Sequence, residues 1–162
     1  MKLSNILLSN RENIANAWAK HLYNTKRYKR VHSSKEVVAL TGEITDAIYD
    51  SLRKKDFSAI DRWAETIAQL TLKHDMKLSQ VQYDCVYYLD TVVPLLVGEM
   101  SGKELERALK KIISRVTYMT TRFSNFFEAL HFSQIKDYTD NLEQKVIDGS
   151  RDLANSEAKY RT

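Results

Sequence analysis

The chain has 162 residues, of which only four are Gly and one is Pro, about a quarter of their share in average proteins. β-Sandwiches and barrels need a turn with Gly or Pro every 8–12 residues or so, so the composition excludes them and favours an all-α fold with few, long helices. Charged residues make up 28% and hydrophobic residues 43%, which excludes a disordered chain. The formal net charge is only +4, so we expect no nucleic-acid partner.

Three further features indicate where the protein acts. The single cysteine, Cys85, allows no internal disulfide and suits a reducing compartment. The longest apolar run, residues 92–97, is far shorter than the roughly 18 residues that span a bilayer. Residues 1–8 are too short and polar for a secretory signal. We expect a cytoplasmic protein with no membrane partner.

Capping residues and apolar stripes mark the helices in chain order. We expect helices at about 4–25, 34–54, 57–73, 79–97 and from 102 onward. Capping boxes, in which a serine and an acid or amide three residues later satisfy the first backbone N–H groups, are predicted at Ser33–Glu36, Ser79–Gln82 and Ser101–Glu104. Asp56 is the expected N-cap of the third helix. Apolar residues recur at helical spacing in every segment, so the helices should pack around one core.

The basic run at residues 26–30, Lys-Arg-Tyr-Lys-Arg, lies between the first two predicted helices. A single cluster of this size is typical of a solvated loop, because nucleic-acid grooves need further basic faces for support.

The last thirty or so residues follow a heptad pattern. With Phe132 at position a, β-branched Val146 falls at a and Leu142 falls at d, a choice that favours a two-stranded parallel coiled coil. Asp152 and Glu157 at g and e would repel each other across such a dimer. We define the coil seam as Phe132, Ile135, Thr139, Leu142, Val146, Gly149 and Leu153.

The coil seam lies on a different face from the stripe of the fifth helix. Continued from Leu130, that stripe would fall on Ser133 and Asp137, about 200° away from the seam on a helix of 3.6 residues per turn. Either the helix breaks near residues 131–134, or one long helix faces the core first and a partner chain afterwards. A third reading is that the last helix folds back on its own domain. We favour a protruding helix that forms a homodimer.

No catalytic or metal-binding motif is present in the sequence. It lacks a phosphate loop, HExxH, CxxC and G-x-S-x-G, so we expect no enzymatic activity of this chain and no cofactor. His74 continues the stripe of the third helix and is interpreted as an ordinary C-terminal histidine. The alternative is that His74 is the axial ligand of a haem in a helical gas sensor, with Trp63, Tyr83, Tyr88 and Phe123 around it.

Two resemblances extend this interpretation. Residues 153–162, Leu-Ala-Asn-Ser-Glu-Ala-Lys-Tyr-Arg-Thr, resemble the opening helix of a PAS domain, L-x-x-S-E-x-K-Y-R-x-L. That resemblance implies that a longer protein continues into a PAS domain, as in bacterial sensor histidine kinases. Residues 1–133 resemble the N-terminal domain of RsbR-type stressosome proteins, through the arrays Ile14-x-x-x-Trp18-x-x-x-Leu22, Glu36-Val37-x-x-Leu40, Arg62-Trp63 and Leu78-x-x-Val81. This second resemblance implies a globin-like, haem-free fold that dimerises and sends a long helix into the next domain.

The sequence therefore predicts two parts. Residues 1–133 are expected to form a globin-like sensor domain of about five helices, which binds a small apolar ligand or another protein. Residues 134–162 are expected to form a coiled signalling helix that leads into the downstream PAS and kinase domains. Gly149, at a d position, is the expected weak point of the coil.

Overall fold

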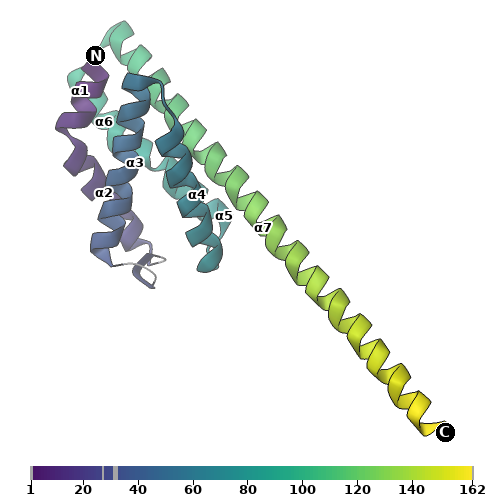
Figure 1. Cartoon of the computed structure of the whole chain (residues 1–162). Helices are drawn as coiled ribbons and strands as arrows, with labels where there is room; N and C mark the ends of the chain where they lie inside the picture. Colours follow the sequence, from purple (N-terminus) through teal and green to yellow (C-terminus); the bar gives the residue numbers. More distant parts are fainter. Residues whose placement is uncertain (1, 27, 31–32, 162) are drawn as a thin grey trace. The chain divides into compact units, whose positions relative to one another are not determined.

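The computed structural model describes residues 2–26, 28–30 and 33–161 (Figure 1). The predicted all-α fold is confirmed, since every regular element in this part of the chain is a helix. The elements are α1 (Lys2–Ser9), α2 (Arg11–Asn24), a short 3-10 helix η1 (Tyr28–Arg30), α3 (Ser34–Lys54), α4 (Ser58–Lys73), α5 (Leu78–Val86), α6 (Tyr88–Glu99) and α7 (Gly102–Tyr160). Arg27 of the predicted basic loop and His32 lie outside the described residues.

The chain divides into two compact units, Met1–Phe127 and Glu128–Thr162. In the first unit, α3 packs against α1, α2 and α4, and α6 packs against α1, α2 and α5. Helix α7 is continuous from Gly102 to Tyr160; of the two alternatives left open by the sequence, a break near residues 131–134 does not occur. We refer to the first unit as the body and to residues 128–160 of α7 as the tail helix.

The core of the body is built around Trp18 of α2. Its ring centroid lies 5.2 Å from that of Tyr88 and 6.1 Å from that of Trp63, and all three side chains are buried. The indole nitrogens donate to backbone carbonyls, Trp18 to Asp84 at 2.9 Å and Trp63 to Leu40 at 3.0 Å. These bonds satisfy the polar atoms that burial would otherwise leave without water.

Two of the predicted helices are each divided in the structure. The segment expected at 4–25 breaks at Asn10, whose side-chain amide donates to the carbonyl of Ile6 at 2.9 Å, a local bond that competes with the regular helix. The segment expected at 79–97 breaks at Tyr87, which ends α5 and precedes α6. Because of this break, two neighbouring aromatic rings both pack on α2. The ring centroid of Tyr87 lies 3.5 Å from that of His21, and Tyr88 packs on Trp18.

The caps follow the predictions in part. The capping box at Ser33 and Glu36 is confirmed, with both reciprocal bonds present. The box predicted at Ser79 is wrong: α5 begins one residue earlier without a side-chain cap, and Gln82 instead donates to Ser124 of α7 at 2.8 Å. Asp56 lies one residue before the actual N-cap of α4, but its carboxylate still accepts from the backbone N–H of Ser58 at 2.9 Å.

Candidate functional site

The predicted haem ligand, His74, is half-buried at the C-terminal end of α4. The cavity in the body that is lined by both tryptophans does not include His74; it measures about 20 Å³, whereas sites for drug-sized ligands occupy about 300–1,000 Å³. Of the aromatic residues expected around a haem, Tyr88 and Phe123 are core residues, but Tyr83 is 62% exposed. These positions give the haem alternative at His74 no support.

Two other candidates for chemistry in the body are a metal site and the thiol of Cys85. Among the described residues, no three His, Cys, Asp or Glu side chains gather in a way that could hold a metal ion. Cys85 is fully buried, and this burial raises the pKa of its thiol, which keeps it protonated and unreactive. Over the described residues, no helix is both long and apolar enough to cross a bilayer.

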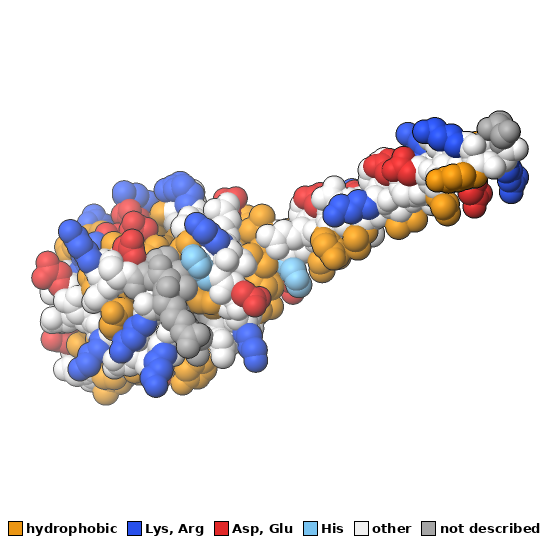
Figure 2. Space-filling model, turned by 90° about the horizontal axis from the view of Figure 1, so that it is seen from below, with side chains coloured by type: hydrophobic (Ala, Val, Ile, Leu, Met, Phe, Trp, Pro, Cys, Tyr) orange, Lys and Arg blue, Asp and Glu red, His pale blue; other side chains and the backbone are white. Residues whose placement is uncertain are grey.

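The coil seam is a stripe of apolar side chains that are exposed on the tail helix. Its apolar members are exposed, Phe132 by 71% and Val146 by 68%, and Thr139 and Gly149 are exposed as well. Figure 2 shows hydrophobic side chains recurring along one side of the tail helix, with charged side chains mostly on the other. Exposed apolar stripes of this length are characteristic of surfaces that bind another protein.

Gly149 is an open position within the seam. A Cβ atom built there meets nothing within 4 Å, so the glycine is not required by any close contact in the chain. A helix with glycine at an interior position is less stable than the same helix with alanine there, by about 1 kcal/mol. The tail helix therefore carries a local weak point at the place where a coiled coil would have a d residue.

The part of α7 inside the body is held by a polar cluster, which we call the Asp61 cluster. One carboxylate oxygen of Asp61, on α4, accepts from the Tyr118 hydroxyl at 2.9 Å and from Arg122 Nε at 2.8 Å. The guanidinium of Arg122 also lies over Phe126, 4.8 Å from the ring centroid. Partial burial and the bond to Asp61 raise the pKa of Tyr118, because both favour the neutral hydroxyl.

A second contact joins α7 to the end of α3. Arg115 Nε donates to the hydroxyl of Ser51 at 3.0 Å, and its guanidinium lies 4.6 Å from the ring centroid of Phe57. Sequence reasoning missed both contacts, because their partners are about sixty residues apart and no spacing rule connects them. The only signal was that Arg115, Tyr118 and Arg122 share the flank of the apolar stripe at helical spacing.

Neither family models, nor curated proteins, nor solved structures gave a match to this chain.

Proposed function

We propose that this chain is a non-enzymatic sensory and dimerisation module of a cytoplasmic bacterial signalling protein, of the sensor histidine kinase class. The body would receive the signal, and the tail helix would form a parallel homodimer through the coil seam. The downstream partners would be the PAS and kinase domains of the same polypeptide.

The exposed coil seam is the observation that carries this proposal. Burying a Val, Leu, Ile or Phe side chain contributes about 1.5–3 kcal/mol, and the seam leaves Phe132, Ile135, Leu142, Val146 and Leu153 exposed at intervals of a coiled coil. A second copy of the chain offers the same pattern and would bury these residues symmetrically, as most soluble homodimers do.

The continuity of α7 supports a role in signalling. The Asp61 cluster holds one part of α7 against α4, while the seam lies further along the same unbroken helix. A signal that binds two arrangements of the body with different affinity would shift their populations. The α7 segment held by the body and the coil register would then change together.

The two resemblances supply the cellular context. The similarity of residues 153–162 to a PAS opening helix supports a PAS domain as the next element. The similarity of residues 1–133 to RsbR-type domains supports a globin-like, haem-free body that dimerises and passes its signal through a helix.

A matched pair of substitutions tests the proposal. Val146 and Ile147 are adjacent, β-branched and exposed by 68% and 52%, but only Val146 lies in the seam. We expect the wild-type chain to dimerise in sedimentation equilibrium, Val146→Asp to be monomeric at the same concentration, and Ile147→Asp to remain dimeric. A monomeric wild type, or equal weakening by both substitutions, would refute the proposal.

A further inference from the structure

The outward face of helix α6 in the body is mainly apolar. Asp90, Pro94 and Val97 are three or four residues apart, so they share one face of the helix, and all three are exposed, Val97 by 56%. Leu89 and Val93 precede Val97 at intervals of four residues and are half-buried. We call these five residues the α6 face. Apolar side chains in a row at this spacing form the kind of surface on which another helix packs.

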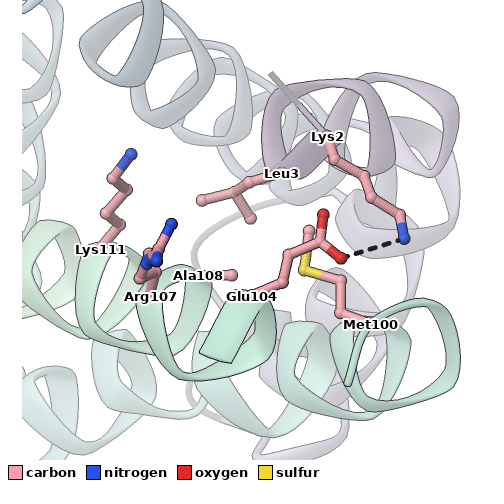
Figure 3. Close-up of a pocket in the computed structure, with 7 residues that line it drawn as sticks. All are labelled: Lys2, Leu3, Met100, Glu104, Arg107, Ala108 and Lys111. Atoms are coloured by element: carbon pink, nitrogen blue, oxygen red, sulfur yellow. Dashed lines mark hydrogen bonds and ion pairs between the residues drawn. The ribbon is translucent and has the colours of Figure 1, made fainter. Parts of the chain in front are cut away.

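The opposite side of α6 is held in the core of the body. Val92 and Leu96 are fully buried, and Met100, four residues further on, is buried as well. In Figure 3, Met100 lines a cleft together with Leu3 of α1. Because these contacts keep one side of α6 in the core, the α6 face is directed away from the core.

The charge at the α6 face is negative. Residues 78–102 contain no Lys, Arg or His, although 25 Lys and Arg are distributed over the 162 residues. Exposed carboxylates lie near both ends of α6, Asp90 in its first turn and Glu99 at its last residue. Over the part of the chain that the structure describes, no Lys or Arg pairs with either of them. Glu104, in contrast, is paired with Lys2 at 3.3 Å (Figure 3).

The apolar row and the negative charge together indicate the kind of partner. A second copy of the chain that docked through the same face would bring its own Asp90 and Glu99 and no cation, and like charges at an interface are costly. A helix with an apolar stripe bordered by Lys or Arg would cover the apolar row and would pair with both carboxylates. Charge complementarity therefore favours a basic amphipathic helix over a second copy of the chain.

We propose that the α6 face docks a basic amphipathic helix of another protein. Apolar residues of that helix cover Val93, Pro94 and Val97, and its Lys or Arg residues pair with Asp90 and Glu99. The two charged contacts orient the docked helix along α6. None of these residues belongs to the coil seam, so this docking does not depend on the proposed dimer.

Fluorescence anisotropy with a synthetic peptide tests the docking. The probe is a labelled peptide of about 18 residues, long enough to form a helix, with Leu at positions i, i+3, i+4 and i+7 and Lys elsewhere. The control peptide has Glu in place of every Lys. We expect saturable binding of the Lys peptide to the full chain, weakened by added salt, and at least about tenfold weaker binding of the Glu peptide.

Matched substitutions locate the site. Asp90→Lys should weaken binding of the Lys peptide by about fivefold or more, because attraction becomes repulsion. Glu43→Lys makes the same charge change at an exposed position of α3 and should leave binding unchanged. Val97→Gln should weaken binding by a similar factor, whereas Ile147→Gln in the tail helix, at a residue of similar exposure, 52%, should not.

Several outcomes would overturn the docking site. These are no saturation with the Lys peptide, equal affinity for the Glu peptide, or equal losses in Asp90→Lys and Glu43→Lys. Loss of peptide binding in Val146→Asp would show that the peptide binds the coil seam, and a weaker dimer in Val97→Gln would show that a second copy covers the α6 face; either result would refute the proposal. Peptide binding at the α6 face by a wild-type chain that is monomeric would support this proposal and refute the dimer alone.

Discussion

The two parts of α7 place similar apolar residues in opposite environments. In the body, Ile112, Val116, Met119 and Phe123 are buried, whereas Phe132 and Val146 of the tail helix are among its most exposed large residues. Helical periodicity is present in both parts, so periodicity alone does not tell a core stripe from an interface stripe. The difference is that other helices of the body cover its stripe, whereas the coil seam of the tail helix is exposed.

The largest expected effect comes from a matched pair of phenylalanines, Phe123 and Phe132. Phe123→Ala should destabilise the body by about 3–5 kcal/mol, because it leaves a cavity in a packed core. Phe132→Ala should change the stability of the body by less than about 0.5 kcal/mol but weaken the dimer. Urea unfolding followed by the fluorescence of Trp18 and Trp63 measures the body, and sedimentation equilibrium measures the dimer. Equal losses of body stability would contradict the division into two parts.

The second prediction concerns a substitution of Gly149, the glycine at a d position of the coil seam. Gly149→Leu should strengthen the dimer by at least about 3 kcal/mol, a hundredfold or more, since one leucine of each chain becomes buried at about 1.5–3 kcal/mol apiece. Gly149→Ala separates the causes, because it supplies only the helix propensity of about 1 kcal/mol per chain. Ser156→Leu, the next d position, should act in the same direction. An unchanged dissociation constant for Gly149→Leu would show that residue 149 does not face a partner.

The Asp61 cluster gives the third prediction. Asp61→Ala removes the acceptor of Tyr118 and Arg122 and should destabilise the body by about 2 kcal/mol; hydrogen bonds to charged groups contribute about 1.5–3 kcal/mol, and the partial exposure of this pair reduces the effect. Glu65→Ala, one turn further along α4 and exposed, is the control and should change stability by less than about 0.5 kcal/mol. Similar losses in the two variants would show that the cluster contributes nothing specific.

Alkaline pH should weaken the body through Cys85. Because burial raises the pKa of the thiol in the folded state, the unfolded chain loses its proton first, at an ordinary cysteine pKa of about 8.5. The contribution of Cys85 is therefore fully present below about pH 8.5 and is lost as the pH rises, with a limiting slope of about 1.4 kcal/mol per pH unit. Urea unfolding between pH 8 and 10 should show this slope for the wild type and a smaller one for Cys85→Ala. Equal slopes would exclude the thiol as the cause.

The apolar stripes and most helix boundaries could be predicted from the sequence because they depend on local spacing. Val81, Cys85, Tyr88, Val92 and Leu96 are all buried as their spacing indicates, even though the helix divides at Tyr87. That division could not be predicted, since it depends on where the rings of Tyr87 and Tyr88 find space against α2.

Of the candidate sites, the one that depends on local spacing could be predicted from the sequence, and the one that joins distant residues could not. The coil seam follows from a heptad that can be read locally. The Asp61 cluster could not be predicted, because it joins residues of α4 and α7 that are far apart in the sequence, and no pattern within either segment names its partner. Gln82 shows the converse error: its spacing from Ser79 predicts a cap, but a bond to Ser124 of α7 takes its amide instead.

The smallest expected effect tests the orientation of the two tail helices. In a parallel dimer, Asp152 at g faces Glu157 at e of the partner chain, and these like charges repel. Asp152→Lys should turn the repulsion into attraction and strengthen the dimer by about 0.2–1 kcal/mol per pair, and Glu157→Lys should do the same. The double variant restores a like-charged pair and should lose the gain, whereas an antiparallel dimer would not show this cancellation. Sedimentation equilibrium at low and high salt gives a second check, because screening reduces the gain of each single variant. Additive gains in the double variant would show that these residues do not face each other, and the parallel arrangement would then be wrong.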